Sequence, residues 1–257
     1  MNEAALEPMG LDAAVLGVAV VFARVGGVFL IAPGLSSLRV PMQVKLFLAL
    51  GIALAMAPLV LDDAVVAVGS GAPADLLKVL GTETMIGLTI GLLSRLLLMA
   101  LQTMSVAISN MVGLGAIPGV GLEGAEPSQT TATLFMATAV VIIFLADLHH
   151  EILRALVGSY AVVPPGGGID VREALVSVAD RAATTFFVAL RLAAPFVIYS
   201  VIVNFAIGLT NKLTPSIPVF FVALPFVTAG GLLMMALAIR EVMTAFADAF
   251  RQLAIAS

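Results

Sequence analysis

The sequence predicts an all-α membrane protein built from about six apolar segments. The mean hydropathy is +1.16 and only 11% of the 257 residues are charged, against roughly a quarter in soluble domains. The apolar residues gather in runs of about 15 to 30, lengths that suit helices crossing or entering a bilayer. Glycine and proline bound several of these runs, which favours helical hairpins joined by turns.

Composition also excludes several classes of function. The chain has no cysteine, so disulfides, thiolate catalysis and cysteine metal sites are ruled out. A net charge of −4, spread along the chain, gives no footprint for nucleic acid. There is no tryptophan and there are only two tyrosines, so the usual interfacial aromatic belt is missing. The missing belt weakens the idea that every segment simply spans lipid.

The six expected segments differ in length. They cover approximately residues 11–31, 46–61, 79–108, 132–146, 186–203 and 217–239. The second and fourth are short for a span, which takes about 20 residues. Short runs bounded by glycine or proline can be half-helices buried in protein instead of full spans.

Local signals mark the ends of the segments in order. The first ends at Pro33-Gly34, and the second ends near Pro58. The third follows Pro73, and a polar cluster after residue 146 closes the fourth. The sequence 164–168, Pro-Pro-Gly-Gly-Gly, is the clearest turn in the chain.

The C-terminal half has helical signals of its own. Residues 171–184 read as an amphipathic helix that precedes the fifth segment. Pro195 and Pro225 are expected to bend the fifth and sixth segments. The tail after residue 239 is again amphipathic.

The stretch between the third and fourth segments, Asn110 to Pro127, cannot be a helix because glycine and proline interrupt it throughout. It nevertheless stays apolar, unlike a solvated linker. One interpretation is a segment that lies in a cavity and can move; the other is a connector with turn residues. The candidate residues are Gly113, Leu114, Gly115, Ile117, Pro118, Gly119, Val120, Gly121 and Leu122.

Four charged residues inside apolar segments are candidates for buried pairs: Arg24, Glu83, Arg95 and Arg191. An arginine at the centre of a membrane helix costs about 2.5–3.5 kcal/mol, so each needs a partner or a wet surface. Glu83 and Arg95 are separated by about 18 Å of helix rise, so any pairing is between helices or between subunits. The alternative is that the arginines reach the headgroups, which suits Arg191 best.

Gly87 and Gly91 form a GxxxG pair in the third segment and predict close packing against a neighbouring helix. The basic residues Arg39 and Lys45 favour a cytoplasmic first loop, and the acidic second loop fits the outside. The third loop should then be cytoplasmic, but it is not positive. The partial failure of the charge rule indicates that a simple topology of six spans is wrong or incomplete.

One polar cluster offers metal-ligand chemistry: Asp147, His149, His150 and Glu151. Its spacing matches no metal motif, and a polar cap at the membrane interface explains it better. No nucleophile–base pair, phosphate loop or carboxylate pair stands out. The sequence therefore predicts no catalytic residue, no metal site and no cofactor.

Two long stretches, Phe22 to Pro58 and Leu190 to Phe226, together with Glu83, Gly87, Gly91 and Arg95, resemble the FliR family of the type III export apparatus. Their specific parts are an Arg24…Pro33…Pro41…Pro58 series and a Gly208…Lys212…Pro215…Pro225 series. The virulence-secretion relatives, the SctT-like proteins, share the pattern more loosely. The resemblance covers nearly the whole chain, residues 1–257, as one helical subunit.

The resemblance implies a core subunit of the export gate that joins FliP and FliQ around a pore for unfolded flagellar substrates. It implies a fusion of a FliP-like and a FliQ-like part, with bent hairpins, and FlhB and FlhA as neighbours. It places the protein in the bacterial inner membrane at the flagellar basal body. It also implies that the loop containing Ile117 plugs the pore.

Three alternatives stay open beside the flagellar gate. A secondary transporter would use Arg24, Glu83 and Arg95 at a site in the middle of the membrane. A purely structural membrane scaffold would leave the loop inert. A virulence-type secretion homologue would share the architecture.

Overall fold

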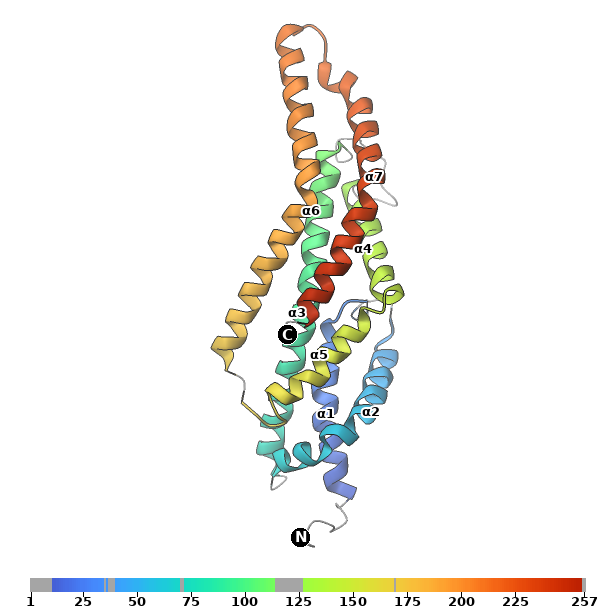
Figure 1. The fold of residues 1–257 in the computed structure, drawn as a ribbon. Coiled ribbons are helices and arrows are strands. Elements are labelled where there is room, and N and C mark those ends of the chain that lie inside the picture. Colours follow the sequence, from blue (N-terminus) through green and yellow to red (C-terminus); the bar gives the residue numbers. More distant parts are fainter. Residues whose placement is uncertain are drawn as a thin grey trace. The chain divides into compact units, whose positions relative to one another are not determined.

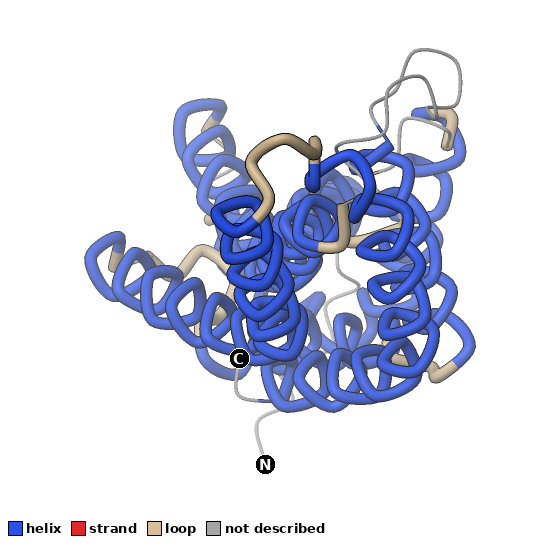
Figure 2. The backbone as a smooth tube through the Cα atoms, turned by 90° about the horizontal axis from the view of Figure 1, so that it is seen from above, coloured by secondary structure: helices blue, strands red, loops and turns tan. Residues whose placement is uncertain are grey.

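A computed structural model describes residues 11–34, 36, 40–69, 72–113, 127–168 and 170–255. All regular structure in these residues is α-helical, as Figures 1 and 2 show, and no strand occurs among them. The predicted all-α fold class is therefore confirmed.

Seven helices make up the described chain (Figure 1). They are α1 (Leu11–Ile31), α2 (Met42–Val68), α3 (Pro73–Met111), α4 (Pro127–Leu145), α5 (His149–Val162), α6 (Val171–Leu213) and α7 (Val219–Ile255). α1 begins and ends where the first apolar segment was expected. α2, α3, α6 and α7 are longer than the apolar segments they contain.

The second apolar segment is not short, because α2 continues for 27 residues through Pro58 and the exposed Asp62 and Asp63. Hydropathy falls at the two aspartates, yet the backbone keeps its helical hydrogen bonds past them. The amphipathic stretch 171–184 and the fifth segment likewise form one continuous helix of 43 residues. Pro195 lies inside it.

Helix α5 was missed by the sequence reasoning. Its buried side chains, Ile152, Leu156 and Tyr160, follow one another at four-residue intervals along one face. α5 is separated from α4 by a short break in which Asp147 has a left-handed φ of 56°. Aspartate tolerates this conformation better than most residues.

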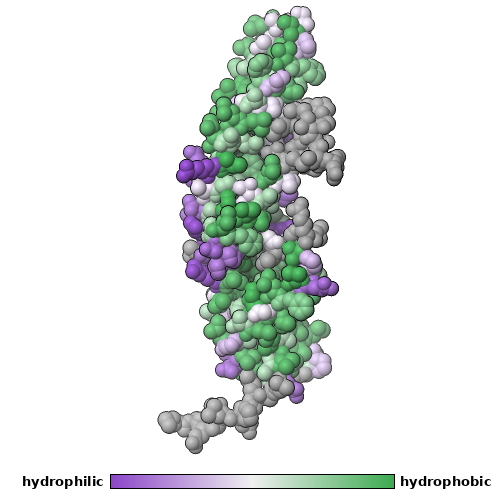
Figure 3. All heavy atoms as spheres, turned by 90° about the vertical axis from the view of Figure 1, so that its right-hand side faces the viewer, coloured by the Kyte–Doolittle hydropathy of each residue, from purple (hydrophilic) through white to green (hydrophobic). Residues whose placement is uncertain are grey.

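Five helices are long and apolar enough to cross a membrane: α1, α2, α3, α6 and α7. α4 and α5 pass the same test only when taken together as one broken span. On the face shown in Figure 3, hydrophobic side chains cover most of the described surface. These features fit a membrane-embedded chain.

The chain folds into two compact units. The first unit consists of Met1–Arg95, His149–Arg181 and Leu253–Ser257, and the second of Leu96–Leu148 and Ala182–Gln252. In the first unit, α1 and α2 lie side by side (Figure 1). The second unit has a core in which the end of α3 packs on α6 through Ile108, Val112, Ala193 and Phe196.

Candidate functional site

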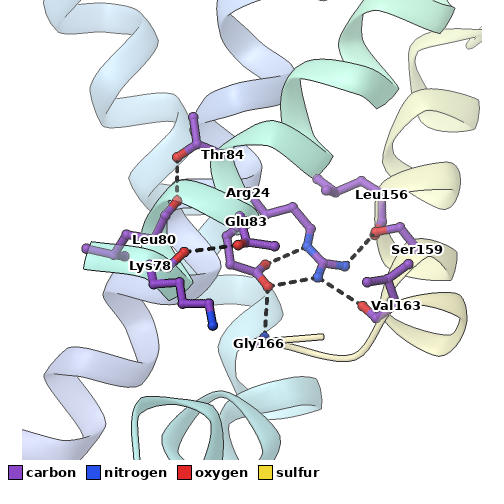
Figure 4. A network of polar contacts seen from close by, with 10 residues as sticks. Arg24, Lys78, Leu80, Glu83, Thr84, Leu156, Ser159, Val163 and Gly166 are labelled. Atoms are coloured by element: carbon purple, nitrogen blue, oxygen red, sulfur yellow. Dashed lines mark hydrogen bonds and ion pairs between the residues drawn. The ribbon is translucent and has the colours of Figure 1, made fainter. Parts of the chain in front are cut away.

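A buried ion pair joins α1 to α3 in the first unit (Figure 4). The Arg24 Nε donates to Glu83 Oε2 over 2.6 Å, and Arg24 Nη2 donates to Glu83 Oε1 over 3.0 Å. Both side chains are 0% exposed. The two parallel bonds make this a bidentate, charge-assisted contact, the strongest kind of pairing between these groups.

Further polar groups complete the shell of Arg24, all of them from α5 and the turn after it. Nη1 donates to Ser159 Oγ over 3.0 Å, and Nη2 donates to the Val163 carbonyl oxygen over 2.9 Å. The Ser159 hydroxyl in turn donates a hydrogen bond to the Leu156 carbonyl oxygen over 2.7 Å. The guanidinium carbon also lies 3.9 Å from the centre of the Tyr160 ring, a cation–π contact. Four of the five guanidinium N–H groups are thus satisfied.

Glu83 has a third donor. The backbone N–H of Gly166 donates to Glu83 Oε1 over 3.1 Å (Figure 4). Gly166 has a φ of 72°, in the left-handed region that favours glycine, and a Cβ there would come within 2.7 Å of the Ala67 Cβ. The Pro-Pro-Gly-Gly-Gly turn that stood out in the sequence therefore brings a backbone donor to a buried carboxylate.

Glycines set the distance between α1 and α3. A Cβ on Gly87 would collide with the Arg24 carbonyl oxygen, and a Cβ on Gly91 would lie 2.9 Å from the Val28 carbonyl oxygen. From the other side, a Cβ on Gly27 would lie 2.6 Å from the Thr84 carbonyl oxygen. The two backbones therefore touch, as a small-residue crossing allows.

This crossing also explains why the ion pair forms. Glu83 lies one helical turn before Gly87 on the same face of α3, and Arg24 lies one turn before Gly27 on α1. Close approach at the glycines therefore brings the two charged side chains together. The sequence identified Gly87 and Gly91, but it did not single out Gly27, whose only local signal is the pair Gly26-Gly27 inside an apolar helix.

We call the Arg24–Glu83 ion pair, together with its hydrogen bonds to Ser159, Val163 and Gly166, the clamp. The carboxylate accepts three hydrogen bonds, two from the Arg24 guanidinium and one from the backbone N–H of Gly166. Solvent does not reach either charged side chain. An arrangement closed in this way holds α1, α3 and α5 together and offers no accessible site for a transported solute.

The other two arginines do not join this pair. Arg95 is half-buried, and Arg191 is exposed in a groove of about 430 Å³ in the second unit. Glu241 and Asp248 line the same groove. Among the described residues, neither arginine has an ion pair within 4.0 Å.

The polar cluster after α4 is divided between the units. Asp147 belongs to the second unit, and His149, His150 and Glu151 belong to the first. Glu151 pairs with Arg154 one turn later, over 2.8 Å, on an exposed surface.

Only the first residue of the candidate plug lies within the described residues. Gly113 has a φ of 82°, and a Cβ there would be 3.2 Å from the Thr228 Oγ1 on α7. The preceding Val112 is fully buried and packs so closely on Gly231 that no Cβ fits there. The end of α3 is therefore fixed to α7. Leu114, Gly115, Ile117, Pro118, Gly119, Val120, Gly121 and Leu122 lie outside the described residues.

Comparison with known proteins shows the family. A profile of the family described as bacterial export proteins, family 1, matches residues 15–253. The flagellar biosynthetic protein FliR of Caulobacter vibrioides is 32% identical over 238 residues, which cover 91% of this chain and 93% of that protein. FliR of Escherichia coli K12 is 25% identical over 205 residues, covering 80% and 77% of the two chains.

A virulence-system protein is also similar. The Yop proteins translocation protein T of Yersinia pestis is 26% identical over 181 residues, 66% of each chain. The chain belongs to family 1 of the bacterial export proteins, the family of FliR, and is a membrane-embedded component of a flagellar or type III export apparatus.

Proposed function

We propose that this chain is a non-enzymatic core subunit of the flagellar protein export gate. It assembles with FliP and FliQ around the pore through which unfolded flagellar substrates pass, beside FlhB and FlhA, in the inner membrane at the basal body. The higher identity and coverage of the flagellar relative support the flagellar system over the virulence system.

The observation that carries this proposal is the uncovered apolar surface of α6 and α7. Only 17% of the most apolar stretch of α6 and 6% of that of α7 is buried within the chain, against 44% for α1. Large apolar side chains are exposed along the whole of α6, from Val171 to Leu213. A helix of 43 residues is about 64 Å long, whereas the hydrocarbon core of a bilayer is about 30 Å thick.

Lipid alone therefore cannot cover this surface. The part of α6 outside the hydrocarbon core would expose valine and leucine side chains to water, a costly arrangement for a lone chain. Sister subunits with apolar helices of their own would cover it. This is the arrangement expected of a subunit in a helical assembly.

Photo-crosslinking tests this contact. Benzoylphenylalanine in place of Phe205, which is 73% exposed on α6, is expected to crosslink to FliP or FliQ in cells that produce all three proteins. Arg154, exposed on the polar surface of α5, is the matched control position and is expected to give no such product. Crosslinking of residue 205 to lipid alone would contradict the proposed assembly.

The second part of the proposed function concerns the loop after α3, which we propose plugs the closed pore. Its root is fixed where Gly113 meets α7, and its composition is apolar with many glycines. Apolar side chains of this loop would seal the closed pore against water and ions. Deleting residues 115–121 is expected to leave the complex assembled and to make cells leak small ions. A fully assembled complex that stays ion-tight after the deletion would remove the plug.

A further inference from the structure

An apolar groove of about 200 Å³ lies between α1, α2 and α3 in the first unit. Its described lining consists of glycine and apolar side chains such as Phe22, Leu30 and Leu46, with two polar residues, Lys45 and Thr84. The Thr84 hydroxyl is already satisfied, because it donates to the Leu80 carbonyl over 2.7 Å. Within the described lining, Lys45 is the one polar side chain for which no hydrogen bond or ion pair is found.

Lys45 lies half-buried in the first turn of α2. A cation is unfavourable at a helix N-terminus, where the helix dipole is already positive. No acidic residue lies in this turn, and Pro41 before it makes no side-chain capping bond. Among the described residues, Lys45 has no carboxylate within ion-pair distance. In the described part of the chain, the positive charge that lines this apolar groove therefore has no acidic partner.

The surroundings of the groove are also apolar. Beyond it, α2 exposes large side chains such as Phe47 and Leu54 on a helix long and apolar enough to span a membrane. An occupant that satisfies both features must have a long apolar part for the groove and an anionic group for Lys45. Free phosphate lacks the first of these, and a neutral hydrocarbon lacks the second.

We propose that the groove binds one anionic phospholipid from the surrounding bilayer. One acyl chain lies between α1 and α2, and the headgroup phosphate pairs with the Lys45 ammonium. The positive end of the α2 dipole adds to the positive potential at the headgroup. Neither Arg24 nor Glu83 lines this groove, and it is separate from the proposed plug.

The structure offers a clean variant for each half of the ligand. Gly26 lines the groove, and a Cβ there would meet nothing within 4 Å, so Gly26→Leu fills the groove without a backbone collision. Gly51 on α2 is equally open but does not line the groove, so Gly51→Leu is its control. Lys45→Gln removes the charge, and Lys78→Gln at an exposed position is the control for it.

The experiment is native mass spectrometry of the full-length chain, extracted in mild detergent with the subunits that accompany it, and titrated with phosphatidylglycerol or phosphatidylethanolamine. The unchanged chain, Gly51→Leu and Lys78→Gln are expected to retain one phosphatidylglycerol in preference to phosphatidylethanolamine. Gly26→Leu is expected to lose it. Lys45→Gln is expected to bind it about fivefold more weakly, the factor for roughly 1 kcal/mol per basic residue at a membrane surface.

Three results would overturn the proposal. Equal lipid retention by Gly26→Leu and Gly51→Leu would show that no acyl chain occupies the groove. Loss on Lys45→Gln with no effect of Gly26→Leu would indicate binding of the phosphate group alone. Equal retention of both lipids by the unchanged chain would show that the charge of Lys45 selects nothing.

Discussion

Replacing Glu83 with glutamine tests whether the buried ion pair holds the first unit together. Glutamine keeps the size of the side chain but removes its charge. Its amide oxygen can accept only part of the three hydrogen bonds that Arg24 and Gly166 donate, and its NH₂ group faces other donors. Arg24 then remains as an uncompensated cation at a site with 0% exposure.

The magnitude follows from this burial. Removing one partner of a buried, hydrogen-bonded charge pair costs about 3–5 kcal/mol, which is a factor of roughly 10² to 10³ or more in the folding equilibrium. The Glu151–Arg154 pair is the control, because the Arg154 side chain is 76% exposed and the Glu151 side chain 18%, against 0% for both partners of the buried pair. Glu151→Gln is expected to cost below about 1 kcal/mol, as exposed pairs do.

The assay is equilibrium unfolding of the purified chain in detergent, followed by far-ultraviolet circular dichroism. The absence of tryptophan makes helix content a better signal than intrinsic fluorescence. Replacing both partners with methionine, Arg24→Met with Glu83→Met, is expected to cost less than either single change, because no unpaired charge is left behind. If Glu83→Gln and Glu151→Gln destabilise the chain equally, the clamp has no special role in its stability.

Three further predictions concern the same unit, each measured by the same unfolding assay. Gly87→Ala is expected to destabilise the chain by about 1–3 kcal/mol or more, because its Cβ meets the Arg24 carbonyl oxygen. Gly81→Ala on the same helix meets nothing and is expected to stabilise the chain by up to about 1 kcal/mol. A larger loss of stability in Gly81→Ala than in Gly87→Ala would contradict the close crossing of α1 and α3. Gly166→Ala is expected to destabilise the chain by about 1–2 kcal/mol through backbone strain, and further through the collision of its Cβ with Ala67. Gly168→Ala, whose Cβ would meet nothing within 4 Å, is expected to have little effect. Equal effects of the two changes would show that the conformation of Gly166 does not support the ion pair. Tyr160→Phe is expected to leave the stability unchanged or to raise it, because the buried hydroxyl has no hydrogen-bond partner in the described part of the chain. Tyr160→Leu removes the cation–π contact and is expected to cost about 0.5–2 kcal/mol of stability. A large loss of stability in Tyr160→Phe would reveal a partner for that hydroxyl.

Much of the fold follows from hydropathy. The bounds of α1 match the first apolar segment because a loop with Pro33 and Gly34 follows it directly. The other long helices extend beyond their apolar segments, because a helix continues wherever its backbone hydrogen bonds do, whether its side chains face lipid or water. The exposed Asp62 and Asp63 inside α2 show this difference.

Less of the site follows from sequence. The cost of burying charge required a partner for Arg24, and Glu83 was the available acid, but periodicity could not say which arginine it would meet. That choice depends on the crossing of α1 and α3, and Gly27 contributes to it without a motif of its own. The donor from Gly166 comes from a backbone N–H, which carries no sequence signal at all.

Native mass measurement of the complex, extracted in mild detergent from cells, tests most directly whether other subunits cover the apolar surface of α6 and α7. The single chain has a mass of 26.4 kDa. The expected result is a particle several times heavier that contains this chain together with FliP and FliQ. Recovery of this chain from such cells only as a particle of one 26.4 kDa chain, without FliP or FliQ, would contradict the proposed assembly.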